Sequence, residues 1–214
     1  MGDWNGDGQD SPAVFNGGAF YYSNDVGKTS DWTGIWVGPS GSPVAGHFDA
    51  NYPNDCLGVV QPAQLGEWQV FVLWYACDLT VTTPPIRWHW VSAVLPDQSG
   101  FIGEHQFQVG DWNGDGLDTI AARRSEYFAY SNAPITDVSA IFDGAQYWGD
   151  FFDQESGFFV AGDWDGDGFD SFGVKTNEVL YFFYVNHVNW IAGDLIQAAF
   201  STDILGSVVS WDPG

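Results

Sequence analysis

Short runs of aromatic and β-branched residues, separated by turn-forming residues, follow one another along the whole chain. Such runs predict strands, because aromatic and β-branched side chains fit a half-buried pleated surface. No segment between them carries apolar residues at helical spacing, so the pattern predicts an all-β protein. The predicted strands are 13–15, 19–24, 33–37 and 43–45; 58–60, 69–74, 86–91 and 107–109; 120–122, 126–132, 138–142 and 158–161; and 172–174, 180–186, 196–200 and 207–210.

One acidic phrase recurs between these strands. It reads GDWNGDGQDS at 2–11 (the first loop), GDWNGDGLDT at 110–119 (the third loop) and GDWDGDGFDS at 162–171 (the fourth loop). A weakened copy, GHFDANYPNDC at 46–56 (the second loop), lacks both loop glycines. The units that begin at these loops, approximately 2–45, 46–109, 110–161 and 162–214, have the length of a four-stranded propeller blade. We therefore expect 1–214 to form a single domain, a four-bladed β-propeller with the loops between the first two strands of the blades.

The chain ends bear on how such a ring closes. A strand precedes the second, third and fourth loops, but Met1 leaves no room for one before the first loop. Residues 207–210 can supply this strand, which predicts that the C-terminal strand joins the N-terminal unit and removes the exposed sheet edges. The alternative is that the chain is a fragment of a larger array.

The charge is strongly negative and is expected mainly in loops. The chain has 5 Lys+Arg against 28 Asp+Glu, and 23 of these acids are Asp, which favours turns and cation-binding loops. So few bases make nucleic acids and anionic membranes poor partners. No run approaches the roughly 18 apolar residues that cross a bilayer, and the chain starts without a basic and then apolar leader. We expect no membrane insertion.

The spacing of the acids within the loops predicts calcium sites. Asp at position 1, Asn or Asp at 3, Asp at 5, a carbonyl at 7 and Asp at 8 surround a point with hard oxygens, and Gly at 6 permits the bend. The alternative is an Asx-turn without metal, which would leave several carboxylates close together with no cation. We expect about three Ca²⁺ ions, with a structural role, because binding to the folded form adds stability.

These loops resemble the FG-GAP or VCBS calcium-loop repeats of the integrin α-subunit propeller, of bacterial surface proteins and of certain mushroom lectins. The resemblance covers nearly the whole chain. It implies a final carboxylate at position 9, whereas this chain has it at position 8, as a direct ligand or as an anchor. His47 replaces the first acid of the second loop, so Asp49, Asn51 and Asp55 make a weak site at best. The implied ligands are Asp3, Asn5, Asp7 and the Gln9 carbonyl; Asp111, Asn113, Asp115 and the Leu117 carbonyl; and Asp163, Asp165, Asp167 and the Phe169 carbonyl, with Asp10, Asp118 and Asp170 at position 8.

The two cysteines face each other in the hairpin predicted for the second unit. Opposed residues of an antiparallel pair share one index sum, and that of Cys56 and Cys77 places the turn between Gly66 and Glu67, where a turn is expected. Opposed Cβ atoms have the separation that a disulfide needs. The cysteines form either a disulfide, which would cross-link the one unit whose loop looks unable to hold a metal, or two buried thiols.

The chain is rich in aromatic residues, with 12 Trp and 9 Tyr. Trp4, Trp112 and Trp164, at position 2 of their loops, are expected to pack in the core. Aromatic residues next to Asn, Asp or Ser suit sugar recognition, in which a ring covers the sugar's C–H face; alternatively, they fill the space between sheets. The candidate ligand-binding residues are Tyr22, Asn24, Trp32, Trp88, Trp90, Tyr130, Asn132, Trp148, Tyr184, Asn186 and Trp190.

Binding is a better expectation than catalysis. The chain has no GxSxG, HExxH or phosphate-loop motif, and its four histidines share no spacing. The resemblance implies a calcium-containing lectin, and we expect a multivalent one whose weak sites gain avidity on glycans or glycoproteins. An oligomer is compatible with this function. The expected place of action is extracellular or at a cell surface, with cytosolic storage as an alternative. The alternative function is a protein-binding adhesion or scaffold propeller without a sugar site.

Overall fold

The computed structural model describes residues 1–25, 27–28, 32–65, 68–91, 106–124, 127–130, 132, 135, 157–163, 166–175, 179–183 and 196–199. All regular secondary structure in these ranges is β-strand, which confirms the predicted all-β class. The described part of the chain contains no helix that could cross a membrane. The strands are β1 (Ala13–Asn16), β2 (Ala19–Tyr22), β3 (Thr33–Trp36), β4 (Ser42–Gly46), β5 (Cys56–Leu65), β6 (Trp68–Ala76), β7 (Arg87–Val91), β8 (Gln106–Gly110), β9 (Thr119–Arg124), β10 (Tyr127–Tyr130), β11 (Phe158–Gly162), β12 (Ser171–Lys175), β13 (Val179–Phe183) and β14 (Ile196–Ala199).

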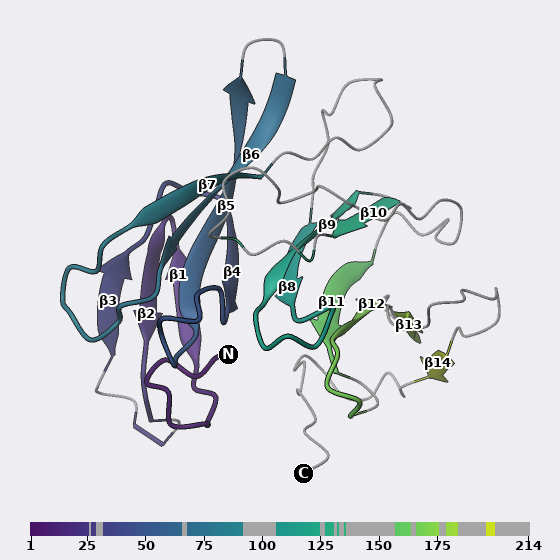
Figure 1. Ribbon diagram of the computed structural model, residues 1–214, viewed down its shortest axis with the longest axis horizontal. Coiled ribbons are helices and arrows are strands. Elements are labelled where there is room, and N and C mark those ends of the chain that lie inside the picture. The colour runs from purple at the N-terminus through teal and green to yellow at the C-terminus, as the bar shows by residue number, and fades with distance from the viewer. Residues whose placement is uncertain are drawn as a thin grey trace.

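These strands form four antiparallel sheets, each built from one stretch of chain (Figure 1). The first sheet is β1-β2-β3, the second β4-β5-β6-β7, the third β8-β9-β10 and the fourth β11-β12-β13-β14. Each sheet is a meander, and the second, third and fourth begin one strand before their loops. No strand of one sheet pairs with a strand of another within the described ranges, so closure into a ring of blades stays a prediction.

The second, third and fourth acidic loops each join two paired strands of one sheet. The glycine that opens the loop lies opposite the residue that closes it, as in Gly110 with Thr119 and Gly162 with Ser171. The second loop has the same register between Gly46 and Cys56. In the first loop the equivalent pair, Gly2 and Ser11, forms an isolated bridge. The loops therefore occupy corresponding places in all four units.

Three apolar clusters join successive sheets, which stand in a row in Figure 1. Alternate residues of β5 point to opposite neighbours, because side chains alternate across a strand. Leu57 and Val59 pack towards the first sheet, whereas Val60 packs towards the third. The third sheet likewise directs Ala122 towards the second sheet and Ala121 towards the fourth. The two middle sheets are therefore covered on both faces.

The second sheet confirms the predicted hairpin. Leu57 pairs with Ala76 and Leu65 with Trp68, a register with the same index sum as Cys56 and Cys77. The two cysteines form a disulfide with Cα atoms 4.2 Å apart, so the alternative of two buried thiols is wrong. β5 and β6 extend well beyond the predicted ranges 58–60 and 69–74.

Some of the other predictions concern described residues and can be compared with the structure, whereas others concern residues outside the described ranges. Trp4 and Trp112 are 3% and 1% exposed, as expected of core residues. Trp164 lies outside the described residues, and so do the predicted strands 138–142 and 207–210. The third sheet accordingly has three described strands, and the joining of 207–210 to the first sheet is not tested.

Candidate functional site

The first loop folds around the carboxylate of Asp3. Its Oδ1 accepts hydrogen bonds from the backbone N–H groups of Gly6 (2.8 Å) and Asp7 (3.0 Å), and its Oδ2 accepts one from Gly8 (2.7 Å). Gly6 and Gly8 have φ angles of 72° and 81°, which residues with a Cβ rarely adopt. The two glycines thus allow a turn tight enough for three N–H groups to reach one side chain.

The third and fourth loops repeat this geometry. Asp111 Oδ2 accepts a hydrogen bond from the N–H of Gly116 (2.7 Å), and Asp163 Oδ2 accepts one from that of Gly168 (2.9 Å). Each of these loops also has two glycines with positive φ, between 72° and 85°. The repeat in the sequence is therefore a repeat in backbone structure, centred each time on the first aspartate.

The loops contain oxygen donors suited to a hard cation, although no complete metal-binding group is described. Beside Asp3, the Asn5 Nδ2 donates to Asp7 Oδ2 (2.9 Å), so a carboxamide and a second carboxylate lie together. No three His, Cys, Asp or Glu side chains within the described ranges are arranged to hold a metal ion. The donors fit Ca²⁺ in type, and carbonyl oxygens and water would have to complete its coordination.

The first loop also favours the charged form of Asp3. Burial raises the pKa of this carboxyl, but the hydrogen bonds from Gly8, Asp7 and Gly6 outweigh it and hold the pKa below its usual value. An ionised carboxylate is required for binding a hard cation. The loop backbone thus prepares Asp3 for the role that the resemblance implies.

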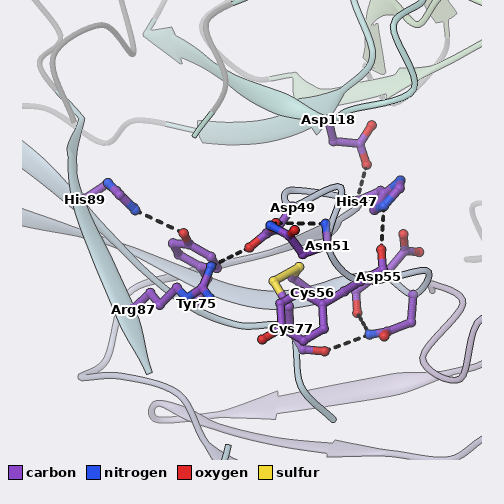
Figure 2. Close-up of a disulfide and its surroundings, with 12 residues drawn as sticks. His47, Asp49, Asn51, Asp55, Cys56, Tyr75, Cys77, Arg87, His89 and Asp118 are labelled. Carbon is purple, nitrogen blue, oxygen red and sulfur yellow. Dashed lines mark hydrogen bonds and ion pairs between the residues drawn. A yellow bond between two sulfur atoms is a disulfide. The ribbon is translucent and has the colours of Figure 1, made fainter. Parts of the chain in front are cut away.

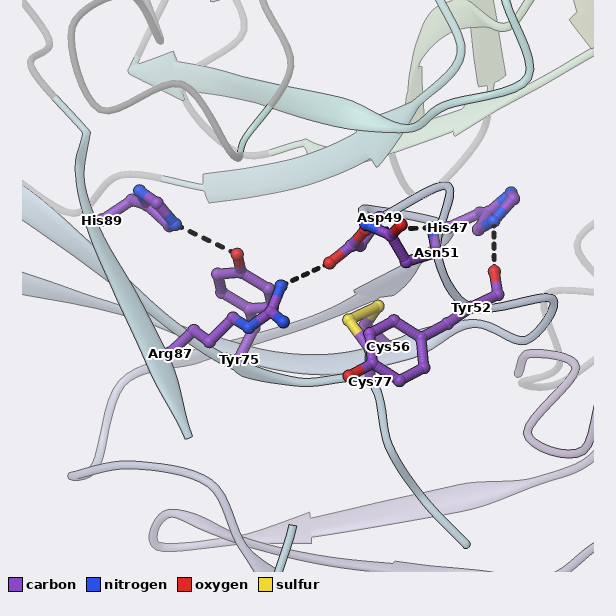
Figure 3. Close-up of polar contacts among 9 residues, drawn as sticks. All are labelled: His47, Asp49, Asn51, Tyr52, Cys56, Tyr75, Cys77, Arg87 and His89. Atoms are coloured by element: carbon purple, nitrogen blue, oxygen red, sulfur yellow. Dashed lines mark hydrogen bonds and ion pairs between the residues drawn. A yellow bond between two sulfur atoms is a disulfide. The ribbon is translucent and has the colours of Figure 1, made fainter. Parts of the chain in front are cut away.

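The second loop is held by an ion pair instead of an acidic cage. Asp49, whose side chain is 2% exposed, pairs with Arg87 and accepts hydrogen bonds from the backbone N–H (3.0 Å) and side chain (2.7 Å) of Asn51 (Figure 3). His47, at position 1, bonds through Nε2 with the Tyr52 carbonyl oxygen (2.8 Å). The Asp49 carboxylate is therefore already engaged by Arg87 and by Asn51, and this arrangement disfavours a cation there.

A row of polar side chains continues from this ion pair across the second sheet. The Tyr75 hydroxyl and His89 Nε2 are 3.0 Å apart, and their rings are stacked (Figures 2 and 3). Burial, followed by the charge of Arg87, lowers the pKa of His89. Sequence reasoning missed Arg87 as the partner of Asp49. Arg87 could have been noticed, because it is one of only 5 Lys+Arg residues and lies on a predicted strand next to the disulfide-bonded hairpin.

The last aspartate of each later loop bonds to position 1 of the preceding loop. Its carboxylate accepts the N–H of that residue, and its own N–H donates to that residue's carbonyl oxygen. We call these contacts interloop pairs; Figure 2 includes the side-chain bond of one, from Asp118 to His47. The interloop pairs are Asp55 with Asp3 (2.8 and 2.8 Å), Asp118 with His47 (2.7 and 2.9 Å) and Asp170 with Asp111 (2.8 and 2.8 Å).

These pairs favour the anchoring role over direct ligation for the position-8 aspartates. Asp118 and Asp170 bond to a neighbouring unit rather than closing their own loops. Burial raises the pKa of Asp118 to about 7, and burial likewise raises the pKa values of Asp55 and Asp170. Asp10, the equivalent residue of the first loop, is exposed.

The interloop pairs, together with the position-2 tryptophan at Gly2 and Gly110, explain the glycines that open the first three loops. A Cβ on Gly2 would lie 2.9 Å from Asp55 Oδ2, and one on Gly110 would lie 2.7 Å from Asp170 Oδ2. A Cβ on Gly46 would likewise lie too close to the carboxylate of Asp118, in the third loop. None of these three glycines has a positive φ, so close approach and not backbone conformation requires them.

Two aromatic candidates lie in the core. Tyr22 and Tyr130 are 4% and 6% exposed. The Tyr22 hydroxyl donates to the Leu79 carbonyl oxygen (3.0 Å), and the Tyr130 ring packs on Trp112 and Phe172. Both tyrosines fill space between sheets, which was the alternative to ligand contact.

The other candidates are exposed or lie outside the described side chains. Trp32 and Trp88 are 38% and 50% exposed, and Asn24 and Asn132 are exposed as well. The backbone of Trp90 belongs to β7, but its side chain is not described. Outside the described residues are Trp148, Tyr184, Asn186 and Trp190, together with the predicted ligand Asp165.

Trp88 has the most developed surroundings of the exposed candidates. It lies opposite Trp74 in the pairing of β6 and β7, with ring centroids 6.3 Å apart and planes at 41°. Trp74 also lies close to the segment that joins β3 to β4, because a Cβ on Gly38 would be 2.8 Å from Trp74 Cβ. The buried Trp74 Nε1–H has no hydrogen-bond partner in the described structure. The Trp74–Trp88 pair of the second sheet therefore combines an exposed ring with a buried donor.

No family model, curated protein or solved structure matches this chain. Its described residues define an all-β protein of sequential antiparallel sheets, with an acidic loop between the first two strands of the second, third and fourth sheets and before β1 in the first. The resemblance to calcium-binding repeats is therefore carried by the loop residues themselves.

Proposed function

We propose that this protein is a calcium-stabilised, multivalent carbohydrate-binding protein, a four-bladed propeller of the FG-GAP or VCBS type. The order of the sheets supports the propeller, because each sheet is a meander that packs on the next one in sequence. The recurring geometry of the first, third and fourth loops supports calcium in a structural role.

The observation that carries sugar binding is the Trp74–Trp88 pair. Trp88 is 50% exposed, and an exposed aromatic ring suits stacking on the apolar face of a sugar. Trp74 and Trp88 are paired on β6 and β7 of the second sheet.

Glycan binding by the wild type and by Trp88→Ala tests this function. Loss of a stacked ring worth about 1.4 kcal/mol weakens binding tenfold, so we expect at least that loss in titration against the best glycan from an array. Phe158→Ala is the matched control, because Phe158 is a 69% exposed aromatic residue far from the pair in sequence. Equal binding by Trp88→Ala and the wild type would exclude this site.

Calcium is tested separately by thermal unfolding. We expect chelation to lower the melting temperature and added Ca²⁺ to restore it, because the cation binds the folded form. The triple variant Asp3→Asn, Asp111→Asn, Asp163→Asn should lose this response. A melting temperature that does not change on chelation would contradict calcium stabilisation but would leave the sugar-binding proposal unaffected.

The alternative function is a protein-binding adhesion or scaffold module. It would be favoured if the wild type bound no glycan on an array yet captured a defined protein partner equally well before and after that partner was deglycosylated. The disulfide is compatible with an extracellular or cell-surface place of action, because such bonds persist in oxidising compartments.

A further inference from the structure

The first sheet has an uncovered apolar face. Val14, Tyr21 and Trp36 are 55%, 44% and 58% exposed. Val14 pairs with Tyr21, and Trp36 pairs with Ala19, two residues from Tyr21 on β2, so all three side chains lie on one face. The opposite face packs on the second sheet through Phe20 and others. We call the uncovered side the outer face of the first sheet.

In every other sheet, the residue at the position of Val14 is buried. Val14 is the third residue after Ser11, which closes the first loop, and the equivalent residues all belong to clusters that join their sheet to the preceding one. Each of them is 0% exposed. The equivalents of Val14 are Val59 in the second sheet, Ala122 in the third and Val174 in the fourth.

Asp10 also differs from its equivalents in the other three units. It precedes the residue that closes its loop, as do Asp55, Asp118 and Asp170, each of which forms an interloop pair with the preceding loop. Asp10 is exposed. In a ring of four units, the loop that precedes the first is the fourth, and its position 1 is Asp163.

We propose that the fourth sheet of the same chain covers the outer face of the first sheet and that Asp10 and Asp163 form a fourth interloop pair. The Asp10 carboxylate accepts the Asp163 N–H, and the Asp10 N–H donates to the Asp163 carbonyl oxygen. This inference rests on the four-bladed ring of the proposed function but not on sugar binding.

One exposed residue of the fourth sheet, Lys175, fits this role. Lys175 is exposed and stands four residues after the end of its loop, at the position of Arg123 in the third sheet. Arg123 reaches across to the next unit, where it donates to the Gly157 carbonyl oxygen (2.7 Å). Lys175 therefore marks the side of the fourth sheet that faces the following unit, which in a ring is the first sheet. In a ring, the side marked by Lys175 would lie against the outer face of the first sheet.

Cross-linking tests the fourth interloop pair directly. The variant Asp10→Cys, Asp163→Cys should form a disulfide within one chain on mild oxidation, read by peptide mapping and non-reducing electrophoresis. The matched control His47→Cys, Asp118→Cys joins residues that already form an interloop pair, so it fixes the expected yield. A control that cross-links while the test variant stays reduced, or links only separate chains, would overturn the proposal.

Footprinting of the unaltered protein provides a second readout that needs no variant. Ring closure predicts that Trp36 is oxidised by hydroxyl radicals at least several-fold more slowly than the exposed Trp88, with a monomer mass from light scattering. Equal labelling of Trp36 and Trp88, or protection only in a dimer, contradicts closure within one chain. A failed glycan assay with Trp36 protected would remove the lectin function and leave the closed ring intact.

Discussion

Reduction of the Cys56–Cys77 disulfide should destabilise the protein by an amount that its position predicts. The bond closes a loop with a sequence separation of 21 residues, across the hairpin of β5 and β6. Both cysteines are buried in the cluster that joins the second and third sheets. The cross-link therefore restricts the unfolded chain and sits where the folded chain is well packed.

The chain-entropy relation gives the magnitude. For a closed loop of about 22 residues the cross-link removes about 11 cal/mol/K of unfolded-state entropy, which corresponds to about 3 kcal/mol at 25 °C. Replacement of both cysteines by alanine should cost somewhat more, because it also removes two buried sulfur atoms. Either loss is a large part of the stability of a domain, which is typically about 5–15 kcal/mol.

Urea unfolding of the oxidised wild type, the reduced wild type and the variant Cys56→Ala, Cys77→Ala measures these losses. The variant must not respond to reductant, which controls for other effects of the reagent. The Asp49–Arg87 ion pair holds the second loop, so the effects of reduction and chelation should add within about 0.5 kcal/mol. A reduction effect below about 1 kcal/mol would refute the entropic reasoning, and loss of the calcium response on reduction would refute the independence of the second loop.

Two further substitutions test the loops and the polar row. Gly110→Ala places a Cβ 2.7 Å from Asp170 Oδ2 and 2.8 Å from Trp112 Cη2, so we expect a loss of about 2–4 kcal/mol in urea unfolding from overpacking and a weakened interloop pair. Gly116→Ala is its control: φ is +83° but nothing lies within 4 Å, so strain alone should cost about 1–2 kcal/mol, and equal losses in the two variants would contradict the interloop explanation. Burial and Arg87 lower the pKa of His89, so the unfolded state binds more protons below its own pKa of about 6.5. His89 therefore contributes stability near neutral pH that is lost as the pH falls below this value, and His89→Gln should lose less stability than the wild type between pH 7.5 and 5. An identical pH response in both proteins would show that His89 is not buried in its neutral form.

Much of the local structure was predictable because it depends on neighbours in sequence. The periodic runs identified the strands, and one index sum fixed both the register of β5 and β6 and the disulfide. The GDW phrase located the loops, whose glycines have the positive φ that a tight turn needs. These features follow from residues within one unit.

The contacts between units were not predictable in the same way. The sequence of the third loop does not show that Asp118 bonds to His47, which is 71 residues away, and not to a residue of its own loop. Nor does a strand pattern show which aromatic residues are covered by a neighbouring sheet, so Tyr22 and Trp88 carried equal weight as ligand candidates. The opening glycines were the one available signal, since they occur where a neighbouring carboxylate lies against the backbone.

The aspartates of the loops therefore perform two different tasks, and their surroundings separate the tasks electrostatically. Backbone N–H groups hold the pKa of Asp3 below its usual value, which keeps a negative charge at position 1. Burial raises the pKa of Asp118 to about 7, so this interloop carboxyl carries only part of a charge near neutral pH. The negative charge is thus favoured at Asp3, on the first loop, and reduced at Asp118, between the second and third units. A cation bound at position 1 would meet an ionised carboxylate, while neighbouring sheets could approach without the repulsion that the formal net charge of -23 suggests.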